Sequence, residues 1–260
     1  MRRAGLLFFL LSALPAAGKA QQPFVTDDAD VTPRREFHFE YYNEYVALSQ
    51  SASPDLRQDT SNFVIQYGLF NGFEVNVDLP LISIERSRES SIGSAFGLGD
   101  IDFAFKWRLV PEDGARPAFT LSGAVEVPTG DRASQLGSGF TDYSVNTVVQ
   151  KTFWETTVVH VNGGLQFSGD TLTGAIGIRT PGRIWTAGAS AAHDVSKTLR
   201  LGIDFNGAQI RTAGIIQRQL QLTAGGNYLL NEKMSIDFAL LTGWSNSPRA
   251  GVLLGVSITP

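Results

Sequence analysis

Residues 101–109, Ile-Asp-Phe-Ala-Phe-Lys-Trp-Arg-Leu, alternate strictly between large apolar side chains and small or charged ones. Successive side chains of a β-strand point to opposite faces, so this stretch predicts a strand with one apolar and one polar face. About a dozen segments of roughly ten residues repeat the pattern along the chain, and a turn signal separates each from the next. The alternation predicts an all-β protein.

The connections between these segments alternate in length. We expect strands at residues 36–48, 61–70, 73–84, 99–109, 117–127, 141–153, 157–167, 183–193, 198–207, 215–229, 233–244 and 249–259. Short turns are expected at 71–72, 111–114, 154–155, 194–197 and 231–232, and longer loops at 49–60, 85–98, 128–140, 168–182, 208–214 and 245–248. The first turn, Asn71-Gly72, is a strong hairpin signal, because both residues tolerate positive φ.

Short turns that alternate with longer loops are typical of outer-membrane barrels. We therefore predict a closed antiparallel transmembrane β-barrel of about 12 strands, an up-and-down meander with both termini on the periplasmic side. A secreted soluble β-protein with an apolar interior would show the same alternation. The polar face of the segments is rich in charged and amide side chains, which favours the membrane barrel, with its water-filled or polar interior.

The aromatic residues test this orientation. All four Trp lie near a strand end, whereas a soluble sandwich places most Trp in the middle of its strands. Trp and Tyr prefer the bilayer interface, where an apolar ring and a polar group are both accommodated. The candidate interface belts are Tyr67, Trp107, Trp154 and Tyr228 near the short turns, and Tyr143, Trp185 and Trp244 near the longer loops.

The first 20 residues have the features of a secretion signal. Arg2 and Arg3 precede a short apolar core, and Gly18-Lys19-Ala20 predicts cleavage after Ala20. The alternative, an uncleaved anchor, needs about 18 apolar residues, and this core is shorter. We expect a signal peptide at 1–20, an extended polar lead-in on the periplasmic side at 21–35, and the barrel at 36–260.

Composition excludes several classes of protein. The net charge of −4 is spread along the chain and argues against a nucleic-acid partner. The chain has no Cys, which excludes disulfides, thiolate metal sites and lipoprotein anchoring. No segment after the signal offers about 18 consecutive apolar residues, so a helical membrane protein is not expected.

Metal, cofactor and catalytic sites find little support. The three histidines, His38, His160 and His193, are not spaced as metal ligands, and we expect no metal and no cofactor. An outer-membrane barrel hydrolase is the enzymatic alternative, with His160 beside Ser144 or Ser122, but the chain lacks a G-x-S-x-G signature. Gly97-Leu98-Gly99-Asp100 opens a strand and not a helix, so a phosphate loop is not expected there. We therefore predict that the protein is not an enzyme.

The polar face predicts the lining of the lumen. Its candidate residues are Glu40, Glu44, Glu74, Asp78, Asp100, Asp102, Lys106, Arg108, Glu126, Asp142, His160, Arg200, Asp204 and Asp237. Two interpretations stay open: an ion-pair network that fills a narrow barrel, or the lining of a functional pore. Acidic residues outnumber basic ones, so any conductance is expected to be cation-selective.

The alternation changes at Pro80. Leu79 belongs to the outward face, yet the next apolar residues are Ile82 and Ile84. A one-residue slip of this kind predicts a β-bulge at Pro80. The bulge is either a kink that shapes the barrel or a break that opens a side route from the lumen to the bilayer.

Several short motifs resemble one family over nearly the whole chain after the signal. They are Phe24-Val25-Thr26-Asp27-Asp28, Asp78-Leu79-Pro80, Gly97-Leu98-Gly99-Asp100-Ile101, Trp107-Arg108 and Val127-Pro128-Thr129-Gly130-Asp131. In this order they resemble the meta-pathway phenol-degradation family of transporter-like outer-membrane barrels. The resemblance implies passive uptake of small apolar compounds and no catalytic residues. The end of the chain, Ile258-Thr259-Pro260, lacks the terminal aromatic residue that barrel assembly usually reads.

These observations lead to one functional interpretation and two alternatives. We expect a Gram-negative outer-membrane channel or porter for passive uptake of small molecules, and only the resemblance indicates that these are aromatic or hydrophobic. Its expected partners are the lipid bilayer, the small-molecule solute and the outer-membrane assembly machinery. The alternatives are a non-transporting structural barrel with a filled lumen and the barrel hydrolase.

Overall fold

The computed structural model describes residues 23–47, 57–86, 93–172, 179–212, 215–245 and 247–260. Its strands are β1 (Phe37–Ala47), β2 (Arg57–Phe70), β3 (Phe73–Glu85), β4 (Ala95–Leu98), β5 (Ile101–Val110), β6 (Ala118–Val127), β7 (Asp142–Phe153), β8 (Thr157–Leu172), β9 (Arg179–Asp194), β10 (Leu199–Thr212), β11 (Ile215–Asn231), β12 (Met234–Trp244) and β13 (Ala250–Ile258). The described residues contain no helix that is long and apolar enough to cross a membrane.

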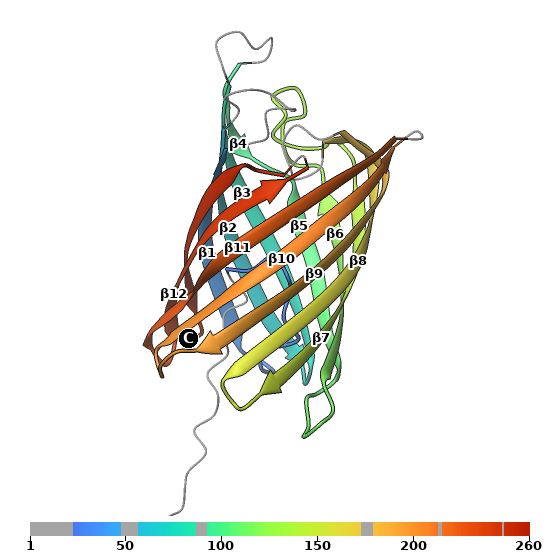
Figure 1. The fold of residues 1–260 in the computed structure, drawn as a ribbon. Helices are drawn as coiled ribbons and strands as arrows, with labels where there is room; N and C mark the ends of the chain where they lie inside the picture. Colours follow the sequence, from blue (N-terminus) through green and yellow to red (C-terminus); the bar gives the residue numbers. More distant parts are fainter. Residues whose placement is uncertain (1–22, 48–56, 87–92, 173–178, 213–214, 246) are drawn as a thin grey trace, which may run out of the picture.

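The strands form one closed barrel (Figure 1). Each pairs antiparallel with its neighbours in the sequence, and β1 closes the circle by pairing with β13, from Phe39 opposite Ile258 to Ala47 opposite Ala250. Strands β4 and β5 both pair with β3 and together form one interrupted strand of the wall. The wall therefore has twelve strands, which confirms the predicted meander barrel.

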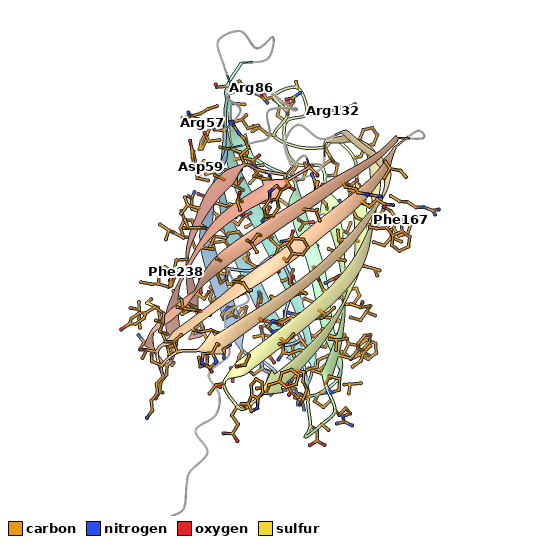
Figure 2. The ribbon with its side chains drawn as sticks, viewed as in Figure 1. Arg57, Asp59, Arg86, Arg132, Phe167 and Phe238 are labelled. Carbon is orange, nitrogen blue, oxygen red and sulfur yellow. The ribbon has the colours of Figure 1, made fainter. Side chains whose placement is uncertain are left out.

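The alternation assigns side chains to the two faces of the wall. On β10, Ile203 is 58% exposed on the outside, whereas the next residue, Asp204, is fully buried inside. Phe167 likewise projects from the outer wall in Figure 2. Because an antiparallel strand directs its odd and even residues to opposite faces, the apolar set covers the outside and the polar set fills the inside.

The short turns lie together at one end of the barrel, with the chain's C-terminus (Figure 1). Gly72 has a φ of 79°, as the predicted Asn-Gly turn requires. Trp154 and Glu155 adopt φ values of 51° and 61° in a three-residue connection without glycine, 154–156. These tight connections hold neighbouring strands in register at this end.

Several strands are longer at the opposite end than the alternation predicts. The predicted loop at 168–182 is largely strand, because β8 runs to Leu172 and β9 starts at Arg179. In the same way β10 continues to Thr212 and β2 begins at Arg57. Alternation requires one lipid face and one water face, so it disappears where both faces of a hairpin meet water, although backbone pairing continues.

The predicted bulge at Pro80 is wrong. Strand β3 pairs with β2 without interruption through Pro80, which lies opposite Asn62. Ile82 and Ile84 therefore stay on the lumen side, where Ile84 is completely buried. They are apolar because they meet other apolar side chains inside the barrel, as described below.

The slip in register lies on the other side of β3. Asp78 pairs with Asp102, whereas Leu81 pairs with Leu98, so the two residues 79–80 of β3 face the three residues 99–101. The extra residue at 99–101 directs Ala95 and Gly97 inward. The Gly99 N–H donates to the Pro80 carbonyl at 2.8 Å across this irregularity. A side route would have to break that hydrogen bond.

The predicted interface residues lie on the outside of the wall. Six of the seven are exposed, namely Trp107, Tyr143, Trp154, Trp185, Tyr228 and Trp244, and Tyr67 is half-buried against Phe37. Their contact with the bilayer interface remains a prediction. The predicted signal peptide, residues 1–20, lies outside the described residues.

Candidate functional site: the lumen and its two closures

The N-terminal residues 23–33, called the lumen segment below, lie inside the barrel near the short-turn end (Figure 1). The Ala29 N–H donates to Gln150 Oε1 at 2.8 Å, and Thr120 Oγ1 donates to the Ala29 carbonyl at 2.9 Å. Ala29 is fully buried and packs against Ala118 and Val148. The wall therefore holds the segment through backbone hydrogen bonds and apolar contact.

Ion pairs fix the same segment. Lys106 Nζ lies 2.8 Å from Asp27 Oδ1 and 2.7 Å from Asp28 Oδ1, and its side chain is only 4% exposed. Arg108 lies 3.5 Å from Asp30 in a more open position. The lysine and one of the arginines predicted for the lumen wall are thus neutralised by carboxylates that the segment brings in.

Two wall carboxylates receive donors from the segment. Glu74, which is 1% exposed, accepts the Thr32 N–H. Asp204, which is fully buried, accepts the Thr26 hydroxyl and the Val25 N–H. Hydrogen bonds to a carboxylate are among the stronger ones, so both ends of the segment are firmly anchored.

Glycines on the wall make room for the segment. A Cβ at Gly188 would overlap Thr26, one at Gly202 would lie 2.8 Å from the Phe24 ring, and one at Gly68 would overlap the Pro33 carbonyl. These positions come from three separate strands. The wall is therefore shaped to receive this stretch of chain.

Gly188→Val is expected to push the lumen segment away from the wall. Overpacking costs about 1–3 kcal/mol, which corresponds to about a tenfold rise in the displaced population. A cysteine at the buried Ala29 position reports this as faster labelling by a water-soluble maleimide, since the chain has no other Cys. Gly163→Val is the control, because a Cβ there meets only the Thr186 carbonyl at 4.0 Å. Equal labelling in both variants would contradict the prediction.

Within the predicted lead-in at 21–35, the part that the structure describes, from Pro23, lies largely inside the barrel. That this end of the barrel faces the periplasm remains a prediction. Only Arg34 and Arg35 reach the rim, where Arg34 bridges to Gly68. The acidic residues of the segment explain the position, because they match the positive side chains that the wall directs inward.

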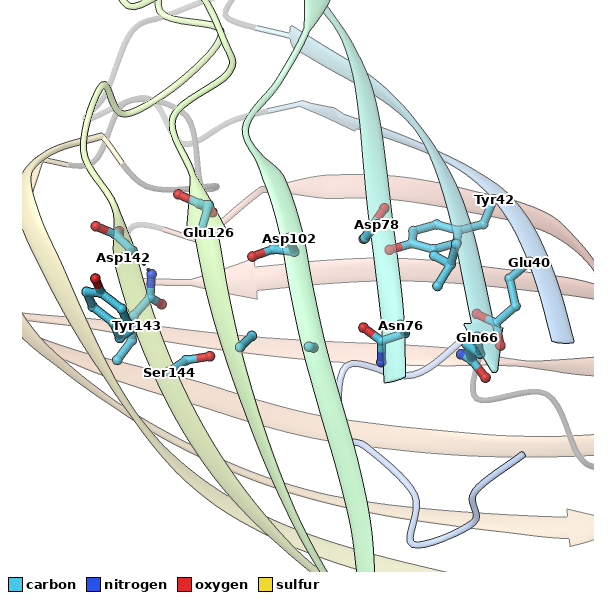
Figure 3. Close-up of a pocket in the computed structure, with 14 residues that line it drawn as sticks. Glu40, Tyr42, Gln66, Asn76, Asp78, Asp102, Glu126, Asp142, Tyr143 and Ser144 are labelled. Atoms are coloured by element: carbon cyan, nitrogen blue, oxygen red, sulfur yellow. Dashed lines mark hydrogen bonds between the residues drawn. The ribbon is translucent and has the colours of Figure 1, made fainter. Parts of the chain in front are cut away.

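Four carboxylates form a row across neighbouring strands of the wall, called the acid row below (Figure 3). Asp78 lies opposite Asp102, Asp102 opposite Glu126, and Glu126 opposite Asp142. Like charges directly opposite each other destabilise a sheet, by up to about 1 kcal/mol a pair. The row therefore costs stability that the fold does not require.

The acid row faces a cavity of about 320 Å³. Glu40 joins it as a fifth carboxylate, and Tyr42 and Gln66 lie among the other lining residues. Among the described residues, no lysine or arginine forms an ion pair with Asp78, Asp102 or Glu126. The basic side chains Lys106, Arg108 and Arg200 pair with other carboxylates, so among the described residues no base balances these three acidic groups.

A second cavity of about 280 Å³ lies against β1, β2 and β8–β11. Its lining includes Glu44, Val25 and amide side chains such as Gln58, Asn162 and Asn206. Val25 belongs to the lumen segment, so the segment forms part of the boundary of this space. The described part of the interior therefore contains cavities and is not a solid core.

The outer end is covered by residues 128–140, called the outer loop below. The Asp100 carboxylate accepts the Gly130 N–H at 2.9 Å and the Ser138 N–H at 2.5 Å. Arg86 donates to the Ser134 carbonyl and, at 2.8 Å, to Gln135 Oε1. These contacts draw the loop over the mouth, at the end where Figure 2 labels Arg86 and Arg132.

Within the outer loop, Asp131 stabilises a tight turn. Its carboxylate accepts the Ser134 hydroxyl at 2.6 Å and the Ala133 N–H at 3.0 Å. The hydrogen bond from Ser134 lowers the pKa of Asp131, which therefore stays ionised well below neutral pH. This carboxylate is exposed, and the donors that it binds among the described residues belong to the loop itself, whereas Asp100 joins the loop to the wall.

The remaining predicted lumen residues have local partners. Asp237 accepts the Ser257 hydroxyl at 2.8 Å, and Arg200 pairs with Asp194 at 2.6 Å. His38 contacts Glu40 at 3.1 Å, and His160 contacts Ser190 at 2.9 Å. These contacts hold the wall and do not converge on one site.

The geometry does not assemble the hydrolase arrangement. His160 bonds Ser190 and not Ser144 or Ser122, and no carboxylate among the described residues hydrogen-bonds its ring. His193 contacts Thr157 at the rim. Within the part of the chain that the structure describes, no three His, Asp or Glu side chains are grouped to hold a metal ion.

Sequence reasoning missed the residues that close the lumen. The lumen segment contributes Asp27, Asp28 and Asp30, and the outer loop contributes Leu136. One signal was available for the first group, since three acids within four residues precede a barrel with few inward bases. Nothing in the sequence of the outer loop indicated that Leu136 is buried.

Comparison with known proteins gives a family and a fold. The model of the family described as "Putative MetA-pathway of phenol degradation" matches residues 47–256. No curated protein matches the chain. The COG4313 outer membrane channel from Pseudomonas putida F1 is 16% identical with a TM-score of 0.70, and the match covers 90% of this chain and 98% of that one.

Two further solved structures share the barrel. The β domain of the Bordetella autotransporter BrkA is 10% identical with a TM-score of 0.55, covering 86% of this chain and 99% of its own. The KdgM porin, solved in complex with disordered oligogalacturonate, is 9% identical with a TM-score of 0.54, covering 85% and 98%. At these identities the likeness shows the fold alone.

Proposed function

The chain belongs to the family described as "Putative MetA-pathway of phenol degradation", and from this premise we propose that it is an outer-membrane channel for passive uptake of small molecules. The family description connects the solute to phenol degradation, which favours aromatic or other hydrophobic compounds. Passive uptake requires no catalytic residue and no cofactor. The outer membrane is the location that a closed barrel with an apolar outer face supports.

One observation carries this function. The described part of the lumen contains cavities of about 320 and 280 Å³, and two short pieces of chain, the lumen segment and the outer loop, lie at opposite ends of the barrel. A barrel that serves only as a structural element gains stability by filling its interior with wall side chains. Here the closures are two pieces of chain that non-covalent contacts hold: ion pairs and hydrogen bonds for the lumen segment, and hydrogen bonds for the outer loop. Such closures suit a passage that opens.

The acid row gives the passage a charge preference. Carboxylates that line a narrow low-dielectric lumen attract cations and repel anions. Uncharged solutes are not repelled by it. The proposed solutes are therefore small neutral or cationic molecules, and carboxylates and phosphates are disfavoured.

We expect any conductance of the purified protein in a planar bilayer to be cation-selective. The reversal potential in a KCl gradient measures this preference, and anion selectivity would contradict the proposal. Replacing Asp78, Asp102 and Glu126 by their amides should lower the cation preference, because it removes three of the five carboxylates at the cavity. Glu232→Gln, at an exposed short turn, is the matched control and should leave it unchanged.

A non-transporting structural barrel is the second candidate. The anchoring of the lumen segment to Glu74, Lys106 and Asp204 favours it, since a permanent filling would also use such contacts. The two functions differ in one measurable respect. A structural barrel shows neither conductance nor solute-dependent uptake, even after the segment is released.

A further inference from the structure

A cluster of apolar side chains lies inside the barrel at the outer mouth. Val46 on β1, Ile84 on β3 and Leu241 on β12 are each at most 5% exposed, and Ile82 and Ala95 pack against them. Elsewhere the buried lumen face is largely polar or charged. Each of the three strands contributes its apolar residue near its outer end. We call this group the mouth pocket.

A residue of the outer loop fills the mouth pocket. Leu136 is 6% exposed and contacts the cluster from above the wall. Gly97 leaves space for it, since a Cβ there would lie 2.9 Å from Leu136 Cδ1. The irregularity at residues 99–101 directs Gly97 inward, so the wall is shaped around this one side chain.

We propose that the mouth pocket is a binding site for a small uncharged hydrocarbon, which takes the place of the Leu136 side chain. The chain's own isobutyl group indicates the chemistry that the pocket accepts. Exposing a leucine side chain to water costs about 1.5–3 kcal/mol, and burying a solute of similar size in its place recovers a comparable amount. Exchange of one for the other is therefore close to neutral.

The surroundings restrict the ligand to uncharged compounds. The Asp100 carboxylate lies beside the pocket, close to Gly137. Asp102, a member of the acid row, is two residues further along the chain. A fatty acid would place its carboxylate against these charges. A short branched alkane or a single aromatic ring matches the size and polarity of the site.

The attachment of the outer loop allows the exchange. Among the described residues, hydrogen bonds hold the loop at two places: Asp100 and the Gly99 carbonyl bind Gly130, Ser138 and Thr129, and Arg86 binds the Ser134 carbonyl and Gln135. Gly137 follows Leu136 in the loop, and Gln135 and Gly139 have φ values of 62° and 74°. Leu136 can leave the pocket when a few hydrogen bonds break, without a change in the wall. This inference rests on the proposed function, because it names where a solute first binds.

The test is a toluene titration of the full protein in lipid nanodiscs with 13C-labelled isoleucine methyl groups. Ile84 reports the pocket, and Ile203, 58% exposed on the outer wall, reports toluene dissolved in the lipid. We expect a saturable shift at Ile84 and a non-saturating one at Ile203. Leu136→Ala removes the competing side chain and should tighten binding at Ile84 about tenfold or more.

Gly97→Leu fills the pocket from the wall and should abolish the saturable shift. Both variants are checked for the heat-dependent gel mobility of a folded barrel. If the Ile84 signal shifts without saturation, as the Ile203 signal does, in both the wild type and Leu136→Ala, the inference is overturned. Saturable binding without conductance would contradict the proposed function but not the pocket, and conductance without saturable binding would contradict the pocket alone.

Discussion

Lys106→Met is expected to release the lumen segment and to open the inner half of the barrel. The Lys106 ammonium is nearly fully buried and neutralises Asp27 and Asp28, with Glu74 close by. Removing one partner from a buried ion pair costs about 3–5 kcal/mol, because the other charges remain buried and unpaired. This corresponds to a rise of about 10²- to 10³-fold in the displaced population. Channel recordings should show more frequent openings.

A cysteine at Ala29 gives an independent measurement of the same release. Its labelling by a water-soluble maleimide should accelerate in Lys106→Met by a comparable factor. Lys151→Met is the matched control, since Lys151 pairs with Glu112 at a short turn, where both side chains are more than one-fifth exposed. If the two methionine variants label alike, the ion pairs do not hold the segment.

Asp100→Ala is expected to detach the outer loop from the mouth. Its carboxylate accepts two backbone N–H donors of the loop, and hydrogen bonds to charged groups contribute about 1.5–3 kcal/mol each. Loss of both should raise the open population of the loop about a hundredfold or more. A cysteine in place of the fully buried Ile84 measures this through its labelling rate.

Asp131→Ala is the control within the same loop. Asp131 accepts two hydrogen bonds as well, but its donors, Ala133 and Ser134, belong to the loop itself. Its removal should loosen the turn and leave the loop over the mouth. A labelling rate at Ile84→Cys that rises equally in both variants would show that the wall contact of Asp100 does not position the loop.

The wall of the barrel could be predicted from the sequence because alternation is a local signal. Each strand that faces lipid carries the same two-residue period, and Asn71-Gly72 sets the register of its hairpin without help from distant residues. The acid row was predicted only as separate inward residues. Their direct opposition depends on the register between strands, which the pattern of one strand does not contain.

The closures could not be predicted because they depend on contacts between distant segments. Asp27 and Lys106 are separated by most of the first half of the barrel, and the local sequence of the lead-in indicates only an extended polar chain. The slip near Pro80 was detected but assigned to the wrong strand. In the sequence, apolar residues that face the lumen give the same pattern as a bulge that reverses the two faces of a strand. Only the structure, in which Ile84 is buried with Leu136, distinguishes these two explanations.

If the lumen is a passage closed by short segments of the chain, removing one closure should open it, and single-channel recording shows whether it does. The wild-type protein is compared with a variant that lacks residues 23–32, with folding verified by heat-dependent gel mobility. We expect small or infrequent cation-selective openings in the wild type and a larger cation-selective conductance in the variant. A folded variant that remains silent, or one that selects anions, would contradict it.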